Sequence, residues 1–270
     1  MTAPSGLRIP NSAPCGEGVI PWQLVVERSG SPGWENMATD MALLGHAASG
    51  GASLRLYRWA PPCLSFGRNE PVSTRYDLSL IRALGLDVVR RPTGGRAVWH
   101  DTELTYAVAG PATMFGSLHD TYLAIHEMLA HGLRRLGVRA EIAPRPSSPM
   151  PAVGAGACFA SPAGGEIVVD GRKLVGSAQL RLGDTFLQHG SVLLENTQHM
   201  VARVTRGPAM PPAATSLADV LGRRVTFDDV ASTLGDTARA VWTGRWAAVS
   251  VAPSADDIAH FKDSSWIGRR

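Results

Sequence analysis

Two apolar runs that meet at Asp170-Gly171 constrain the fold more than any other part of this sequence. The runs cover residues 166–169 and 173–180. An Asp-Gly pair suits a two-residue turn with positive φ at both positions, and such turns join antiparallel strands. The sequence therefore predicts a hairpin that holds Lys173 just past its turn. Cys158 precedes the hairpin. A cation near a thiol lowers the thiol pKa and makes it a better nucleophile, so this pairing suits acyl transfer.

The number and spacing of the cysteines indicate the redox environment in which the protein works. The chain has 270 residues, enough for one large core or two modest domains. Its three cysteines, Cys15, Cys63 and Cys158, lie far apart. They show neither metal-ligand spacing nor the even number of a disulfide framework. This pattern predicts a reducing cytoplasm, and we expect no metal centre and no bound cofactor.

Charge and hydropathy argue against two kinds of partner. The net charge is +3, and no block of Lys and Arg resembles a tail that binds nucleic acid. No apolar run approaches the roughly 18 residues of a transmembrane helix. The N-terminus lacks the charged segment and apolar core of a signal peptide. We therefore expect a cytoplasmic protein whose partners include neither nucleic acid nor a membrane.

Residue patterning divides the chain into three parts. Residues 1–20 are rich in Pro, Gly and Ser, and we expect a loose N-terminal leader. We expect residues 21–252 to form a single catalytic domain of the α/β (α+β) class, a mixed, largely antiparallel sheet flanked by helices. We expect residues 253–270 to form a C-terminal tail. Besides the hairpin, the pattern predicts strands at 22–26, 54–59, 63–67, 87–91, 97–99, 104–108, 186–194 and 246–251, and helices at 34–44, 80–84, 117–136, 216–221 and 227–242.

Three of these elements carry expectations about local detail. The buried face of helix 34–44 comprises Met37, Met41 and Leu44. Asp40 lies off that face by helical spacing. The strand at 54–59 alternates apolar and basic residues, which predicts one buried and one solvated side. A helix is expected to begin at Ser117, a good capping residue, and to end at Gly137.

A second dense motif, RRPTGGRAVWHD, runs from Arg90 to Asp101. Paired glycines let backbone N–H groups approach a ligand closely, and two arginines before them add anion recognition. The alternative is an ordinary Gly-Gly turn with solvated arginines. His100 and Asp101 could form an acid/base pair. However, neighbouring strand residues point to opposite faces, which argues against direct contact.

Each candidate residue also has an ordinary structural explanation. A histidine at a strand end, such as His189, usually serves packing. A lone cysteine is usually a small buried hydrophobe, and a lysine beside a glycine turn is usually solvated. The ordered combination favours a functional interpretation, because RRxxGG is followed by Cys158, then by GRKxxGSAQ, and then by His189-Gly190.

This ordered set resembles the lipoate-protein ligase and octanoyltransferase family, whose core is shared with the biotin-protein ligases. The resemblance runs from about Trp22 to Leu194 and rests on RRPTGGRAVWHDTELTYAV and on ACFASP followed by EIVVDGRKLVGSAQLRLGDTFLQHGSVLL. It looks closest to the cysteine-dependent octanoyl-acyl-carrier-protein:protein N-octanoyltransferases. It implies a fold like the biotin/lipoate-protein ligase catalytic domain. The implied activity belongs to lipoate biosynthesis: octanoate from octanoyl-acyl carrier protein is held on a cysteine, then passed to a lysine of a lipoyl domain or a glycine-cleavage carrier protein.

The resemblance also implies the site residues. Cys158 matches the acyl-accepting cysteine, and Lys173 matches the active-site lysine. The implied substrate-binding residues are Arg91, Thr93, Gly94, Gly95, Arg96, His100, Gly176, Ser177, Ala178, His189 and Gly190. Two positions depart from the family's pattern. Gly164-Gly165 stands where an aromatic residue often precedes the glutamate at Glu166, and Glu70 stands where glutamine is frequent.

Two other functions stay open. An ATP-dependent lipoate- or octanoate-protein ligase would activate the free acid as an acyl-adenylate. Such ligases tend to carry a third glycine where this chain has Arg96, and a side chain there leaves less room for backbone approach to a phosphate. A non-catalytic acyl- or carrier-binding protein would be marked by loss of Cys158 or Lys173. For Lys173 two roles are open: holding the carbonyl oxygen, or taking the proton of the incoming amine.

Overall fold

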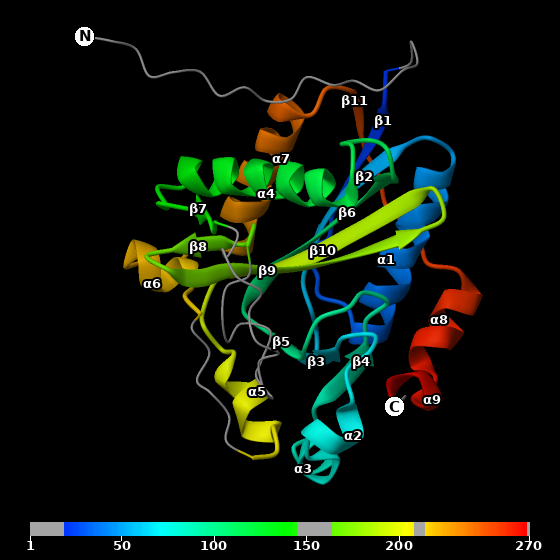
Figure 1. The fold of residues 1–270 in the computed structure, drawn as a ribbon, viewed down its shortest axis with the longest axis vertical. Helices are drawn as coiled ribbons and strands as arrows, with labels where there is room; N and C mark the ends of the chain where they lie inside the picture. The colour runs from blue at the N-terminus through cyan, green and yellow to red at the C-terminus, as the bar shows by residue number, and fades with distance from the viewer. Residues whose placement is uncertain (1–18, 145–163, 208–213, 269–270) are drawn as a thin grey trace.

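The computed structural model describes residues 19–144, 164–207 and 214–268 (Figure 1). The strands in these residues are β1 (Pro21–Val26), β2 (Ala52–Tyr57), β3 (Cys63–Phe66), β4 (Asp87–Arg90), β5 (Val98–His100), β6 (Glu103–Pro111), β7 (Glu141–Ile142), β8 (Ile167–Val169), β9 (Arg172–Leu182), β10 (Thr185–Leu193) and β11 (Arg245–Ala248). The helices are α1 (Gly33–Ala48), α2 (Val72–Arg75), α3 (Leu78–Ala83), α4 (Leu118–Arg135), α5 (His199–Val204), α6 (Leu217–Leu221), α7 (Phe227–Val241), α8 (Ala255–Lys262) and α9 (Ser264–Ile267).

The described strands form two sheets. The larger has eight strands in the order β11-β1-β2-β6-β10-β9-β8-β7, and the smaller has three in the order β4-β3-β5. In the larger sheet β1 runs parallel to β2 and β11, and the other neighbouring pairs are antiparallel. In the smaller sheet β3 is parallel to β4 and antiparallel to β5. The predicted mixed, largely antiparallel sheet flanked by helices is therefore confirmed.

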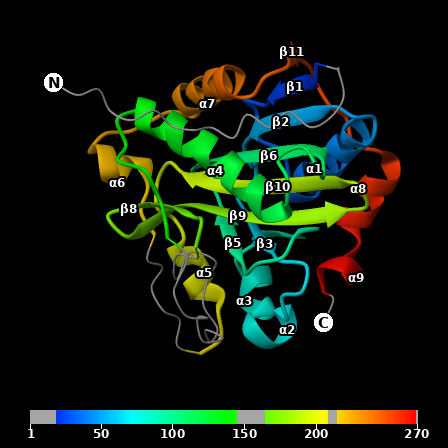
Figure 2. The same ribbon diagram turned by 45° about the horizontal axis from the view of Figure 1, so that its top comes forward.

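Strand β6 shows how the larger sheet is covered on both faces. Leu104, Tyr106 and Val108 pack into a core shared with α4 and α7, whereas Ala107 and Ala109 pack into a second core with α1 and α8. Because successive strand side chains point to opposite faces, this alternation requires a layer on each side of β6. Figures 1 and 2 show the two layers, with α4 beside α7 and α1 beside α8.

The predicted hairpin joins β8 to β9 and is confirmed. Asp170 has φ 48° and Gly171 has φ 73°, so both turn residues adopt the left-handed conformation that an Asp-Gly turn favours. Beyond it, β9 pairs with β10 along most of its length. Local turn chemistry thus fixes where β9 begins, and β9 carries several of the predicted site residues.

The predicted boundaries of α4 are also confirmed. Ser117 caps the helix because its hydroxyl accepts a hydrogen bond from the Asp120 backbone N–H, and the Asp120 carboxylate accepts one from the Ser117 backbone N–H. Gly137 follows the last turn with φ 91°. This reciprocal capping satisfies backbone N–H groups that the helix itself leaves unpaired.

Two predictions about burial are wrong. Strand β2 is buried along its whole length, and Asp40 of α1 is fully buried rather than off the core face. The Arg55 guanidinium lies 2.8 Å from Asp40 and also binds Glu27, while Tyr57 donates to the same aspartate at 2.9 Å. A buried charge is tolerated when its partners are close and hydrogen-bonded, and both partners of Arg55 come from outside β2.

The segment predicted as a C-terminal tail carries α8 and α9. Phe261 is buried in the core that contains α1. The guanidinium of Arg90 donates to the backbone carbonyls of Trp266 and Ile267, and the Trp266 indole donates to the Arg90 carbonyl at 3.0 Å. This end of the chain is therefore attached to the strand that leads into the Gly94-Gly95 turn.

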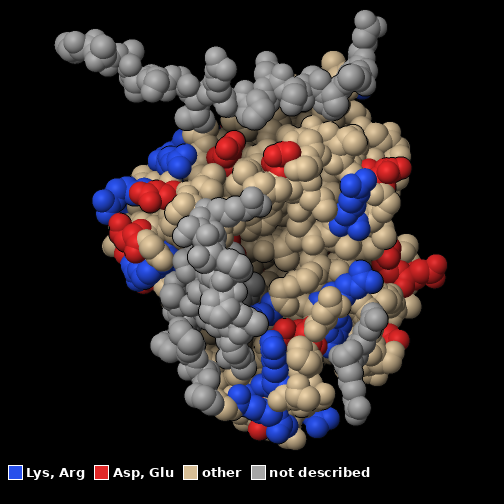
Figure 3. Space-filling view, in the orientation of Figure 1, with Lys and Arg blue, Asp and Glu red and all other residues tan. Residues whose placement is uncertain are grey.

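Basic side chains gather at one end of the molecule, over α2 and α3 (Figure 3). Four arginines in or next to these elements and the neighbouring α5 are exposed, and we call them the arginine surface: Arg68 before α2, Arg82 in α3, Arg203 in α5 and Arg206 after α5. Helix α5 lies beside α3, because the backbone N–H of Asp77 donates a hydrogen bond to the carbonyl of Val204 at 2.8 Å. Among the described residues, no ion pair involves these four arginines. In the same described part of the chain, no helix is both long and apolar enough to cross a membrane.

Candidate active site

Lys173 is buried rather than solvated. Its side chain is 1 % exposed, and its ammonium lies 2.5 Å from Oε1 of Glu166. The hairpin explains the pairing, because Lys173 sits opposite Val168 and Glu166 lies two residues further along the same chain. Diagonal neighbours of this kind are within reach of long side chains. The ordinary explanation for Lys173 as a solvated turn residue is therefore wrong.

His189 of β10 lies in a chain of hydrogen-bonding groups that starts in α1. Its Nδ1 is 2.8 Å from the Asp40 carboxylate, and its Nε2 is 2.7 Å from the Thr93 hydroxyl. A carboxylate beside Nδ1 keeps a proton on that nitrogen, which orients the ring. In the neutral ring Nε2 then accepts from Thr93. The structure thus brings two predicted residues together and adds Asp40, which the sequence did not indicate.

His100 lies in a second buried network, with Glu103 as its partner. The Glu103 carboxylate is 2.8 Å from His100 Nδ1, and the Ser65 hydroxyl is 2.5 Å from Nε2. Burial lowers the pKa of His100, while the nearby Glu103 opposes that shift. Trp59 stacks on the imidazole with ring centroids 3.9 Å apart. The suggested partner Asp101 is replaced in this role by Glu103, three residues away from His100 along the chain.

Both arginines of the RRPTGG motif are buried, so the alternative of solvated arginines is wrong. Arg91 donates to the carbonyls of Gly94 and Arg96, at 3.2 and 2.7 Å, and to the Ser65 hydroxyl. These bonds fix the conformation of the Gly94-Gly95 turn, because the Arg91 side chain binds two of the carbonyl oxygens in it. Gly95 of the same turn has φ 93°.

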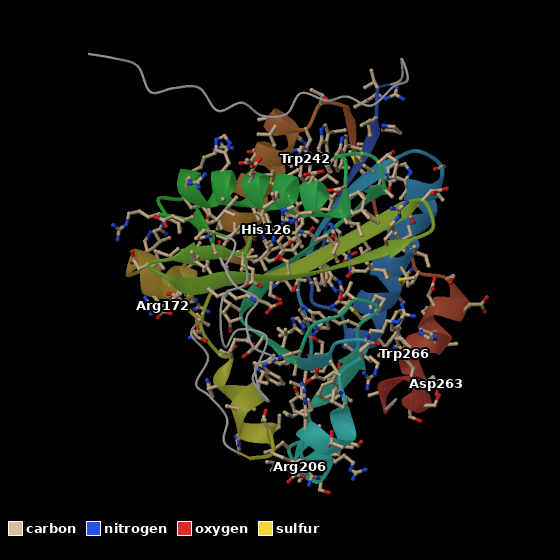
Figure 4. The ribbon with its side chains drawn as sticks, viewed as in Figure 1. His126, Arg172, Arg206, Trp242, Asp263 and Trp266 are labelled. Atoms are coloured by element: carbon tan, nitrogen blue, oxygen red, sulfur yellow. The ribbon has the colours of Figure 1, made fainter. Side chains whose placement is uncertain are left out.

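A third network joins α4 to the larger sheet. His126 of α4 is 2.6 Å from the Gly165 carbonyl through Nδ1 and 2.8 Å from the Ser177 hydroxyl through Nε2. The Tyr106 hydroxyl lies 2.7 Å from that of Ser177, and the Gln188 amide donates to Tyr106 at 3.0 Å. Burial lowers the pKa of His126 to about 4, and Lys173 adds to the shift. Figure 4 labels His126 between α4 and the sheet.

Most of the predicted substrate-binding residues meet at one small cavity. It is lined by Arg91, His100, Gly176, Ser177, Ala178, His189 and Gly190, together with Met37, Tyr57, Trp59, Val98, Thr105 and Ser191. Thr93 touches this group through His189, and Gly94, Gly95 and Arg96 form the turn around Arg91. Lys173 lies further along β9, paired with Glu166. Cys158 lies outside the described residues.

Several residues of these networks were not predicted from the sequence, although two of them, Glu166 and His126, left a signal there. Glu166 occupies the predicted hairpin, from which its proximity to Lys173 could have been read. His126 follows Ile125 in the apolar stripe of a clearly patterned helix. Asp40 and Tyr106 left no comparable signal, because their partners come from distant segments.

Comparison with known proteins identifies the family to which this chain belongs. The lipoyl protein ligase A/B catalytic domain family matches residues 32–238. The chain belongs to this family. Octanoyltransferase LipM of Kyrpidia tusciae is 41 % identical over 234 residues, covering 80 % of this chain and 85 % of the relative. LipM of Carboxydothermus hydrogenoformans is 41 % identical over 191 residues, covering 68 % and 69 %.

Solved structures of lipoyl protein ligases share the fold. Lipoate-protein ligase A bound with ATP superposes with a TM-score of 0.71 at 20 % identity, covering 92 % of this chain and 99 % of its own. The bi-partite lipoate protein ligase from Thermoplasma acidophilum, described with its E2 lipoyl domain, gives 0.68 at 18 % identity, covering 93 % and 97 %. At such identities the likeness concerns the fold alone, and it agrees with the fold that the sequence predicted.

Proposed function

We propose that this chain is an octanoyltransferase of lipoate biosynthesis that works through a thioester on Cys158. The donor is octanoyl-acyl carrier protein, and the acceptor is a lysine of a lipoyl domain or of a glycine-cleavage carrier protein. The observation that carries the octanoyl-transfer assignment is the 41 % identity to octanoyltransferase LipM over most of both chains. The thioester and the carrier donor rest on the ordered motifs of the sequence.

The proposed reaction has two half-reactions. In the first, the Cys158 thiolate attacks the carbonyl carbon of the octanoyl thioester. The bond to the phosphopantetheine sulfur breaks, and that thiolate leaves and takes up a proton. In the second, the ε-amine of the acceptor lysine attacks the enzyme thioester, the amide forms, the amine loses a proton, and the Cys158 thiolate is released.

The Lys173–Glu166 pair supports one of the two roles considered for Lys173. In an ion pair the lysine is an ammonium with three N–H donors, and Glu166 Oε1 takes one of them. A buried ammonium suits stabilisation of the negative charge that develops on the carbonyl oxygen in both half-reactions. We therefore assign Lys173 the role of holding that oxygen.

The arginine surface supports an acidic carrier protein as the donor. Arg68 stands where the surface meets the site, because its backbone N–H donates to the Thr93 carbonyl at 2.7 Å. A positive surface beside a binding site speeds the encounter with a negatively charged partner, and added salt weakens this effect.

Reversing charge on this surface is expected to weaken use of the carrier-borne donor. An Arg82→Glu, Arg203→Glu variant should raise KM for octanoyl-acyl carrier protein by about tenfold at low salt, because rim charges act mainly on association. Its kinetics with octanoyl-pantetheine, which lacks the protein, should match wild type. Steady-state assays with both donors check this, and an equal change for the two donors would contradict it. Arg28→Glu, at an exposed ion pair with Asp228, is the control.

Octanoyl transfer is expected to need no ATP. Purified enzyme mixed with octanoyl-acyl carrier protein should gain one octanoyl group, and adding an acceptor domain should move that group to the acceptor. Intact mass spectrometry follows both steps. Activity that requires ATP and free octanoate, with none from the carrier-borne donor, would favour the ligase. A protein that binds the carrier but gains no group and transfers none would be the non-catalytic alternative.

A further inference from the structure

Arg90, the first arginine of the RRPTGG motif, bridges two parts of the chain that lie far apart in sequence. Its side chain is fully buried. On one edge of the guanidinium, Nε and Nη2 donate to the backbone carbonyls of Trp266 and Ile267 at 2.9–3.1 Å. On the other edge, Nη1 donates to three carbonyls in residues 67–70 at 2.8–3.1 Å. The planar fork of an arginine suits such a bridge, whereas a lysine ammonium is a compact point charge that cannot match both sets of carbonyls.

Helix α9 offers carbonyl groups that suit this guanidinium. The last carbonyls of a helix have no partner within it and carry a partial negative charge, which a cation beside them offsets. Trp266 adds a bond in the other direction, because its indole donates to the Arg90 carbonyl at 3.0 Å (Figure 4). α9 is itself anchored through α8, which packs on α1 and buries Phe261 in the core there.

The loop of residues 67–70 contacts the Gly94-Gly95 turn directly. Arg68 donates its backbone N–H to the Thr93 carbonyl at 2.7 Å. Gly67 lies so close to the turn that a Cβ added to it would overlap the carbonyl oxygen of the second glycine. Because packed groups of this kind transmit displacements, a shift of the loop would move the turn as well.

The turn in its place borders the cavity. The Thr93 hydroxyl binds His189, and the Arg91 guanidinium binds carbonyls of the turn, and both His189 and Arg91 line the cavity. Arg90 is not among the described residues that line it, so it acts on a ligand there through its neighbours. A continuous set of contacts therefore leads from α9 through Arg90 and the loop to the cavity.

We infer that Arg90 and α9 position the Gly94-Gly95 turn against the octanoyl group, so that the C-terminal helices set the shape of the acyl-binding cavity. This inference rests on the proposed function, in which the cavity receives the eight-carbon chain. It gives Arg90 a positioning role in place of the anion recognition that the sequence suggested. Loosening the turn should weaken binding of the acyl chain and the preference for its length, and should change KM more than kcat.

Two variants test this with hexanoyl-, octanoyl- and decanoyl-pantetheine as donors and a lipoyl domain as acceptor. Arg90→Lys keeps the charge but not the bridge. It should raise KM for octanoyl-pantetheine at least about tenfold, since a small misplacement far from the chemistry can cost up to about a hundredfold. Trp266→Phe keeps an aromatic ring and removes one donor, so KM should rise about threefold or more. Both variants should keep kcat within a few-fold of wild type and prefer octanoyl less strongly over the other two chain lengths.

Trp246→Phe is the matched control. The Trp246 indole also donates to a backbone carbonyl, that of Trp242, but from β11 at the other edge of the larger sheet. Its KM and chain-length preference should match wild type. Amide hydrogen exchange adds a readout that needs no substrate. The Arg68 N–H, which is bonded to the Thr93 carbonyl, should exchange several-fold faster in Trp266→Phe than in wild type or in the control.

Thermal unfolding shows whether each variant is folded at the assay temperature. A merely structural role would lower the unfolding temperature and leave KM, chain-length preference and Arg68 exchange of the folded protein unchanged, and that result would overturn the inference. If Arg90→Lys does not fold, Trp266→Phe decides by the same criteria. A wild-type enzyme that transfers no octanoyl group would overturn the proposed function instead, a result distinct from the exchange of the Arg68 amide.

Discussion

Replacing Cys158 with alanine is expected to abolish the octanoyl adduct and to reduce transfer to the acceptor by roughly a thousandfold or more. Removing the nucleophile of a covalent mechanism removes the intermediate itself, and losses of this order or larger are usual. Intact mass after incubation with octanoyl-acyl carrier protein reports the adduct, and acceptor octanoylation reports the overall reaction. An adduct that persists in Cys158→Ala would contradict the assignment.

Cys63→Ala provides the matched control within the described part of the chain. Cys63 is fully buried in β3, and burial raises the pKa of its thiol well above the ordinary value, with Asp87 adding to the shift. It therefore stays protonated at pH 7 and is a poor nucleophile. The variant should form the adduct normally, as should Cys15→Ala. Loss of the adduct only in Cys63→Ala would move the nucleophile to β3.

Replacing Lys173 with alanine is expected to slow transfer by at least about a hundredfold, because it removes a positioned charge from both half-reactions. The same change leaves Glu166 as a buried carboxylate without this partner, and breaking such a pair costs about 3–5 kcal/mol. Thermal unfolding must therefore accompany the rate measurement. Rates within a few-fold of wild type would place Lys173 outside the site.

A double variant distinguishes two effects of Lys173→Ala: the loss of a positive charge from the site, and the destabilisation caused by leaving the buried Glu166 carboxylate without this lysine. Lys173→Met combined with Glu166→Gln removes both members of the ion pair, which is often tolerated better than removing one. We expect this protein to unfold at a higher temperature than Lys173→Ala and to remain as slow. If the double variant regained activity together with stability, the slow transfer by Lys173→Ala would be explained by unfolding and not by the loss of a charge that acts in the reaction.

Arginine at position 173 distinguishes the two chemical roles. Arginine keeps the positive charge but cannot lose its proton in a protein. If Lys173 holds the carbonyl oxygen, Lys173→Arg should retain measurably more activity than Lys173→Ala. Equal inactivity of the two variants, with both proteins folded, would favour the proton-accepting role instead.

The sequence alone was sufficient to predict local structure wherever the residues that determine a turn or a helix end lie within the same short segment. The Asp170-Gly171 turn is one case, because its residues suit positive φ whatever surrounds them. The start of α4 at Ser117 is another, since the capping partner Asp120 is three residues away. The ordered motifs likewise named residues that meet at one cavity, because their order and spacing carry the resemblance to a known family.

Only the tertiary structure decided which polar residues are buried, because the partner that makes burial of a charge tolerable lies far away in sequence. Asp40 is a surface residue by helical spacing, yet it binds Arg55 from the neighbouring strand and His189 from a segment 149 residues away. His126 likewise finds Ser177 only when α4 packs on the sheet. Local pattern determines where strands and helices begin and end, whereas the proton positions and ion pairs of the candidate site depend on contacts that exist only after those elements pack.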